Sequence, residues 1–221
     1  MMEKKRSGLI GALEARFHFM DAWQKEVLDH PVPPRVNFMY CFGGITFFLF
    51  LLLVASGFLM AAYYVPHTEA AYASVEYLQF EVAGGAIVRG VHHWSANLMI
   101  LCITLHMIRV VITGSYKKPM EFHWISGVVL LLLTLGFGFT GYLLPWNMRA
   151  YWASKVGIGM AHTVPKVGEF TAFLVQGGDQ LGALTLTRFY ATHVMYLPLL
   201  TLCFLGLHFW MIRRTGVAEP L

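Results

Sequence analysis

Four apolar segments, each long enough to cross a lipid bilayer, constrain the fold of this chain more than any other feature. They run from about Asn37 to Tyr64, Ile87 to Thr113, Trp124 to Leu144 and Phe189 to Ile212. A helix of about 20 apolar residues spans the hydrocarbon core and satisfies its own backbone hydrogen bonds. Because 57% of the residues are hydrophobic and only 13% are charged, the sequence predicts an all-α membrane protein. We expect residues 35–221 to form a single bundle of four transmembrane helices.

The segment 1–34 differs in character from the rest of the chain. Between residue 7 and about residue 28, apolar side chains are interspersed with charged ones at helical spacing. This spacing predicts an amphipathic helix on the membrane surface. The run Pro31-Val32-Pro33-Pro34 then breaks the helix and forms a sharp entry into the first span.

Basic residues indicate the orientation of the bundle, because cytoplasmic segments carry an excess of Lys and Arg. With a cytoplasmic N-terminus, eleven basic residues lie on the cytoplasmic side and five on the opposite side. We therefore expect a multi-pass protein of a bacterial cytoplasmic (or thylakoid-like) membrane with both termini on the cytoplasmic side. The net charge of +4 then reflects membrane topology and contact with lipid, and it does not indicate nucleic-acid binding.

Two histidine pairs lie inside the apolar segments, where ionisable side chains are costly and usually functional. His106 follows His92 by fourteen positions, and His208 follows His193 by fifteen. At about 100° and 1.5 Å per residue, each pair returns to within roughly 40° to 60° of one helix face and is separated by ~21 to ~22 Å. We expect five other histidines to be solvated polar residues: His18, His30, His67, His123 and His162.

Topology indicates how these histidines pair across helices. The second and fourth spans run in the same direction, so His92 lies at the depth of His193 (the outer pair) and His106 at the depth of His208 (the inner pair). A haem iron held by two imidazoles is an electron-transfer centre with no open ligand position. The sequence therefore predicts two b-type haems stacked across the membrane.

Four arginines lie toward the membrane surfaces from these histidines. Arg89 and Arg109 stand three positions from the nearest of them, and Arg188 and Arg213 stand five positions away. Haem propionates that point toward water would need such cationic partners. The alternative interpretation is that these arginines are ordinary interfacial anchors.

Glycines repeat the fourteen-position interval of the first histidine pair. It separates Gly43 from Gly57 in the first span, and Gly127 from Gly141 in the third. A planar macrocycle can lie against a helix where the side chain is absent, so we expect haem contacts at these four glycines. Small-residue packing between membrane helices is the alternative explanation.

The three cysteines do not suggest a disulfide framework. Cys102 and Cys203 lie in the middle of spans, and we expect both to be small buried hydrophobic residues. There is no Cys-x-x-Cys-His motif for ordinary c-type haem attachment. By its chemistry alone, a lone membrane cysteine such as Cys41 is usually a packing residue.

Five short stretches carry a family resemblance: VNFMYCFGG at 36–44, RGVHHWS at 89–95, YKKP at 116–119, GFTGYLLPW at 138–146 and LTRFY at 186–190. With these stretches the chain resembles cytochrome b6, the N-terminal half of a split cytochrome b, over nearly its whole length. His93 and Arg149 are similar to the versions in Gram-positive bacteria, which favours menaquinol as the quinol.

The resemblance implies a subunit of a proton-translocating quinol:cytochrome c (or plastocyanin) oxidoreductase that is not active alone. Electrons would pass from an outer quinol-oxidising site through the low-potential outer haem and the high-potential inner haem to an inner quinone-reducing site, in a Q-cycle. It also implies a thioether from Cys41 to a third, c-type haem. Tyr142, Trp146 and Tyr151 would border the quinol.

The resemblance further implies partner proteins. They are a companion C-terminal cytochrome b subunit similar to subunit IV, a Rieske iron–sulfur protein and a c-type cytochrome, in a homodimeric complex. Two alternative functions stay open at this point. The chain could be the dihaem membrane anchor of a formate dehydrogenase or hydrogenase type complex, or its histidines could line a proton or metal pathway in a haem-free transporter.

Overall fold

The four predicted spans are long helices in the computed structural model, which describes residues 9–24, 28–29 and 37–216. The first three are α3 (Phe42–Ala61), preceded by the 3₁₀ turn η2 (Phe38–Cys41), then α5 (Gly85–Ile112) and α6 (Glu121–Leu143). The fourth consists of α9 (Ala183–Ala191), the π turn η3 (Thr192–Tyr196) and α10 (Leu197–Thr215). All four spans are long and apolar enough to cross a membrane. The prediction of an all-α, four-helix membrane protein is therefore confirmed.

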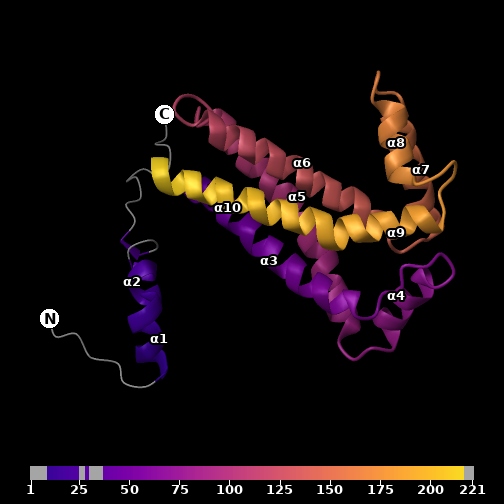
Figure 1. Cartoon of the computed structure of the whole chain (residues 1–221), viewed down its shortest axis with the longest axis horizontal. Helices are drawn as coiled ribbons and strands as arrows, with labels where there is room; N and C mark the ends of the chain where they lie inside the picture. The colour runs from indigo at the N-terminus through magenta and orange to yellow at the C-terminus, as the bar shows by residue number, and fades with distance from the viewer. Residues whose placement is uncertain (1–8, 25–27, 30–36, 217–221) are drawn as a thin grey trace. The chain divides into compact units, whose positions relative to one another are not determined.

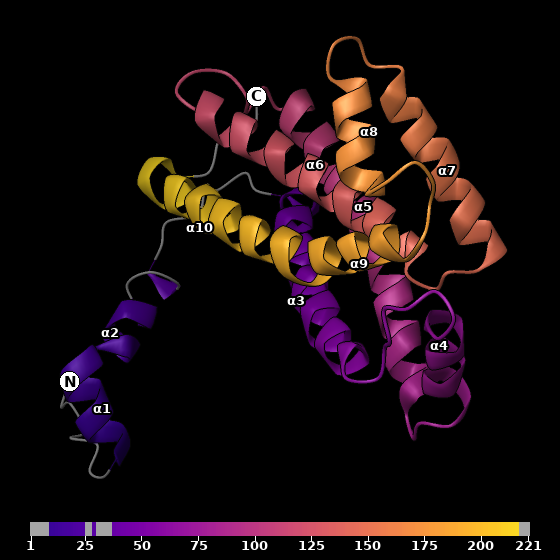
Figure 2. The same ribbon diagram turned by 45° about the vertical axis from the view of Figure 1, so that its right-hand side comes forward.

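Two helix pairs make up the bundle (Figure 1 and Figure 2): α3 packs chiefly against α5, and α6 packs chiefly against α10. At mid-depth, Leu49 and Phe50 of α3 form a buried cluster with Met99 and Cys102 of α5. Partly buried side chains of α6 and α10 pack against the same cluster. Because lipid is as apolar as these side chains, close packing holds such helices together rather than removal from water.

Cysteine burial matches the sequence prediction at one position and not at another. Cys102 is buried, but Cys203 is exposed on α10, so the prediction for Cys203 was wrong. Its thiol lies on an outward face of a membrane-spanning helix. An apolar side chain there meets lipid rather than water, and hydrophobic character does not enforce burial.

Three shorter helices lie in the connections: α4 (Ala71–Phe80), α7 (Met148–His162) and α8 (Gly168–Gln176). They gather with α9 at one end of the bundle in Figure 1 and Figure 2. A second buried cluster holds three of these helices to the end of α6, and its members are Leu143, Ile158, Ala172 and Phe189. The long connection between the third and fourth spans is therefore a packed helical cap on the bundle.

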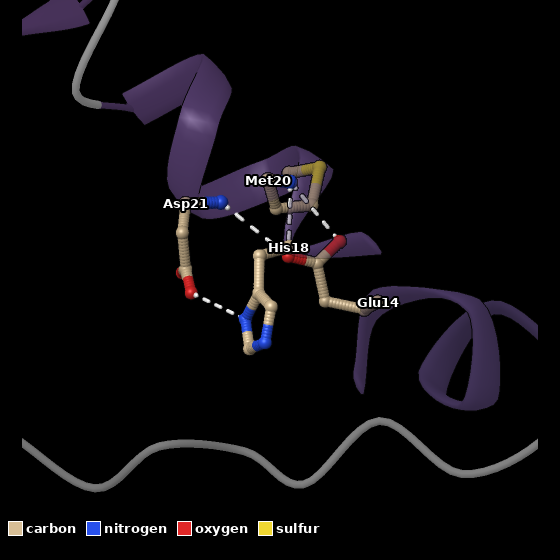
Figure 3. Close-up of polar contacts among 4 residues, drawn as sticks. All are labelled: Glu14, His18, Met20 and Asp21. Atoms are coloured by element: carbon tan, nitrogen blue, oxygen red, sulfur yellow. Dashed lines mark hydrogen bonds and ion pairs between the residues drawn. The ribbon is translucent and has the colours of Figure 1, made fainter. Parts of the chain in front are cut away.

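The described residues before Asn37 belong to a separate unit, in which the predicted single amphipathic helix is divided into α1 (Leu9–Phe17) and α2 (Phe19–Trp23). His18 between them has a left-handed φ of 48°. The Glu14 carboxylate accepts hydrogen bonds from the N–H groups of Met20 and Asp21, and the His18 ring lies 3.3 Å from the Asp21 carboxylate (Figure 3).

These contacts explain why one helix was the wrong prediction for this segment. The Glu14 carboxylate satisfies N–H groups at the start of α2 that would otherwise lack partners, so the break at His18 is stabilised locally. The predicted helix breaker at 31–34 and the predicted domain boundary after residue 34 lie outside the described residues.

Candidate functional site

His92 of α5 and His193 of η3 face each other across the bundle. Their ring centres are 6.4 Å apart with planes inclined at 63°. Two metal–nitrogen bonds of about 2 Å, with about 1.1 Å from each nitrogen to its ring centre, separate two metal-bound imidazole rings by about 6 Å. The separation of the two rings is therefore compatible with one metal ion between them.

The ligand count points to the kind of metal group that fits. No set of three or more His, Cys, Asp or Glu side chains gathers as a metal site within the described residues. A metal held by two histidines of the described part of the chain would therefore need other ligands as well. A porphyrin, which supplies four nitrogens around an iron with two axial positions open, fits that requirement.

The inner histidine pair lies on the same two spans as the outer pair, at the other level. His106 lies on α5 and His208 on α10. Both rings are half-buried, and each faces a glycine of a neighbouring helix: His106 faces Gly43 of α3, and His208 faces Gly127 of α6. The structure therefore arranges four histidines on two levels, as the topology argument expects.

Each of the four predicted glycines faces one of the four histidines. A Cβ atom added at Gly43 would lie 3.2 Å from Cε1 of His106, and one at Gly57 would lie 3.2 Å from Cε1 of His92. In the second helix pair, an added Cβ at Gly141 would lie only 2.6 Å from Cε1 of His193.

The fourth glycine, Gly127, is farther from its histidine than the other three, because an added Cβ there would lie 3.7 Å from Cε1 of His208. The sequence interval between the two glycines of a span thus matches the interval between the two histidine levels. In the protein itself the glycines make room for the imidazole rings, which is a more specific role than general helix packing.

A hydroxyl group precedes three of these glycines and contacts the same histidine. Ser56 Oγ lies 3.0 Å from Nδ1 of His92, and Thr140 Oγ1 lies 3.1 Å from Nδ1 of His193. At the inner level, Ser126 Oγ lies 2.8 Å from Nδ1 of His208. Sequence reasoning missed these hydroxyls, although the dipeptides Ser-Gly, Ser-Gly and Thr-Gly were visible signals.

The longer histidine spacing in the fourth span has a local structural explanation. The N–H of Leu197 donates to the carbonyl of Thr192, five positions earlier, so His193 lies in a π turn that contains one extra residue. Pro198 follows directly and has no N–H to donate, which favours such a local departure from α-helix. The extra residue in the π turn offsets the longer sequence interval. His193 and His208 therefore lie on one face of their span, as His92 and His106 do on a regular α-helix.

The four predicted arginines differ in their surroundings. Arg109 is buried, and its guanidinium carbon lies 4.1 Å from the ring centre of Tyr40. Arg89 Nη1 donates to Gln79 Oε1 at 2.8 Å, and Arg188 Nη1 donates to the Leu174 carbonyl at 2.6 Å. Arg213 is exposed in the last turn of α10. Arg109 is thus the one that the fold places next to the inner level.

Three unpartnered polar atoms gather where η2 meets α5. Tyr40 Oη, Arg109 Nε and His106 Nδ1 are buried and have no hydrogen-bond partner among the described residues. Cys41, the neighbour of Tyr40, is exposed. Buried polar groups normally find partners, so Tyr40 Oη and Arg109 Nε fit a further polar group that the described part of the chain does not supply, such as a propionate.

The predicted quinol-border residues lie at the opposite end of the bundle. Trp146 packs edge-on against Tyr151 with ring centres 5.9 Å apart, and Tyr142 is exposed. Trp146 has a left-handed φ of 50°. Tyr64 donates from its hydroxyl to the Leu144 carbonyl at 2.7 Å and stacks on Tyr190, which fixes the backbone immediately before Pro145.

His123 is a residue whose environment the sequence analysis predicted wrongly. It lies in the first turn of α6, and its Nδ1 is buried. Its ring centre is 6.4 Å from that of His208, and its Nε2 lies 2.9 Å from Thr215 Oγ1. The prediction of a solvated residue failed because α6 begins at Glu121, before the expected start at Trp124, which brings His123 against α10.

Comparison with known proteins gives consistent matches along the chain. A family profile described as cytochrome b/b6/petB matches residues 27–216. The menaquinol:cytochrome c reductase cytochrome b subunit of Geobacillus thermodenitrificans is 46% identical over 217 residues, covering 95% of this chain and 96% of the relative. Cytochrome b6 of Heliobacterium mobile is 47% identical over 210 residues, covering 95% and 99%.

A solved structure shows the same fold. A chain of a hyperthermophilic respiratory complex III is similar with a TM-score of 0.88 and 26% sequence identity. The match covers 96% of this chain and 56% of that one, so the present chain spans little more than half of its length. These similarities support the resemblance to cytochrome b6, and they do not support the two alternatives, a dihaem anchor and a haem-free transporter.

Proposed function

Because this chain belongs to the cytochrome b/b6 family, we propose that it is the transmembrane electron-transfer subunit of a quinol:cytochrome c (or plastocyanin) oxidoreductase. The family implies b-type haem and quinone binding. The observation that supports this proposal most is that His92 and His193 approach each other from two different spans, 6.4 Å between ring centres, with a glycine facing each ring. A haem iron between two imidazoles takes up and releases single electrons without an open ligand position.

We assign the iron ligands by level. His92 and His193 would hold the outer haem, and His106 and His208 would hold the inner one. The chain supplies orientation, apolar surroundings and charge, and the redox chemistry belongs to the cofactors. Arg109 is suited to pair with an inner propionate because its buried guanidinium has an unused Nε within the described part of the chain. Arg89, Arg188 and Arg213 are assigned the same role with less structural support.

A covalent c-type haem at Cys41 is a further part of the proposal. Cys41 is exposed and follows Tyr40, whose ring Arg109 covers. The thiol is therefore free of the helix packing that would make it a structural residue. Its position next to Tyr40 and Arg109 supports a haem near the inner level, where we propose that quinone is reduced.

Quinol would bind at the outer end, bordered by Tyr142, Trp146 and Tyr151. Menaquinol is favoured, in agreement with the Geobacillus relative, which is a subunit of a menaquinol:cytochrome c reductase. The partners are a companion C-terminal cytochrome b subunit, a Rieske protein and a c-type cytochrome in a dimeric complex. The proposal of a companion subunit is consistent with the match to the complex III chain, of which this chain covers 56%. Both termini lie on the cytoplasmic side by the excess of basic residues there.

The experiment is a reduced-minus-oxidised spectrum with pyridine-haemochrome analysis of the purified complex, comparing the natural chain with Cys41→Ala. Two b haems, plus a haem that survives denaturing electrophoresis and disappears in the variant, are the expected result. Two b haems without a denaturation-resistant haem would remove the Cys41 assignment alone. A preparation without b haem would overturn the whole proposal.

A further inference from the structure

Each of the three hydroxyls next to the histidines donates a hydrogen bond to a backbone carbonyl of its own helix. Ser56 Oγ lies 2.6 Å from the Leu52 carbonyl oxygen, and Thr140 Oγ1 lies 2.8 Å from that of Gly136. Ser126 Oγ lies 2.9 Å from the His123 carbonyl oxygen. A carbonyl oxygen only accepts, so the single hydroxyl hydrogen must point toward it in each case.

These hydrogen bonds to the backbone determine which ring nitrogen carries the proton in three of the histidines. With its hydrogen used, each hydroxyl oxygen can only accept from the imidazole, so Nδ1 of His92, His193 and His208 carries the proton. In a neutral imidazole the other nitrogen, Nε2, then keeps its lone pair. A hydrogen bond from the far nitrogen of a ligating histidine fixes the ring and raises its basicity toward the metal.

His106 breaks the pattern. The residue before its glycine, Gly43, is Phe42 rather than Ser or Thr. Its Nδ1 is buried and has no hydrogen-bond partner in the described part of the chain. Within the described residues, the outer pair therefore has two hydroxyl partners, from Ser56 and Thr140, and the inner pair has one, from Ser126.

We propose that Ser56, Thr140 and Ser126 are positioning residues that set the two haems at unequal reduction potentials. More basic ligands favour the more positive, oxidised iron, so two hydroxyl contacts lower the potential at the outer level more than one contact does at the inner level. The difference directs electrons inward. The inference rests on the proposed function, because it requires iron at both levels.

Redox potentiometry of the purified complex tests this inference, with each haem followed by its optical band and its low-spin electron paramagnetic resonance signal. Ser56→Ala and Thr140→Val should each favour reduction of the outer haem. The expected change is roughly tenfold, the low end of what such contacts contribute to metal affinity, or about 59 mV for one electron. Their effects should add, and Ser126→Ala should raise only the inner potential.

Thr134→Val is the matched control. Thr134 is buried on the same helix as Thr140, and its hydroxyl donates to the Leu130 carbonyl at 2.9 Å. This variant should leave both potentials unchanged.

Two b haems with potentials that stay fixed in Ser56→Ala and Thr140→Val would overturn the inference and leave the proposed function standing. A shift in Thr134→Val as large as in Thr140→Val would also overturn it. Absence of b haem from the natural complex would instead mean that the proposed function has failed.

Discussion

Replacement of Gly141 by alanine should remove the outer haem selectively. The added Cβ would lie 2.6 Å from Cε1 of His193, whereas carbon atoms make favourable contacts at about 3.5 to 4.0 Å. The ring must therefore move by about 1 Å, which is half the length of the bond that it makes to a metal. Overpacking of this kind costs roughly 1–3 kcal/mol, so affinity for the outer haem should fall about 5- to 150-fold.

Gly127→Ala is the matched control for this prediction. Its Cβ would lie 3.7 Å from Cε1 of His208, an ordinary contact, and both variants receive the same gain in helix propensity of about 1 kcal/mol. Pyridine-haemochrome analysis of the two purified variants measures haem per chain. We expect Gly127→Ala to keep two b haems and Gly141→Ala to lose the outer one. Equal haem content in the two variants, or greater loss in Gly127→Ala, would refute the steric argument.

Three further perturbations test other parts of the structure. Tyr64→Phe removes the hydroxyl bonded to the Leu144 carbonyl at 2.7 Å and should lower the free energy of unfolding by about 1–3 kcal/mol, measured by thermal unfolding in detergent. Burial, then Tyr190, raises the pKa of Tyr64 above its ordinary 10.0. Its stabilising contribution is therefore complete below pH 10 and is lost as the pH rises further, a loss that the phenylalanine variant should lack. Deletion of Val194 should convert the π turn into α-helix and keep both b haems by haemochrome assay, and loss of a haem would contradict the register argument. Arg109→Gln should lower inner haem content while Arg109→Lys, which keeps the charge, should retain more of it, and equal content in the two would exclude a role for that charge.

Regular periodicity explains what the sequence predicted well. The four spans follow from runs of apolar residues, and two equal sequence intervals predict that Gly43 and Gly57 lie at the depths of the two histidine levels. Helix geometry alone relates such positions, so no knowledge of tertiary packing was needed. The haem contacts predicted at these glycines stay a prediction. The assignment of the four histidines as iron ligands stays a prediction.

Features that depend on contacts between helices were not predictable in the same way. The π turn at His193 depends on Pro198 and on the need to meet the level of His92, which spacing alone cannot show. The hydroxyls of Ser56, Ser126 and Thr140 acquire their role only when a histidine of another helix lies beside them. The break at His18 likewise depends on where the Glu14 side chain folds.

Four single variants test most directly whether the histidines pair across helices at two depths. His92→Leu, His106→Leu, His193→Leu and His208→Leu are each purified, and the remaining haem is identified by its optical band and reduction potential. We predict that the His92 and His193 variants lose one and the same haem, and that the His106 and His208 variants lose the other. Loss of the same haem from the His92 and His106 variants, which change one helix, would contradict the account.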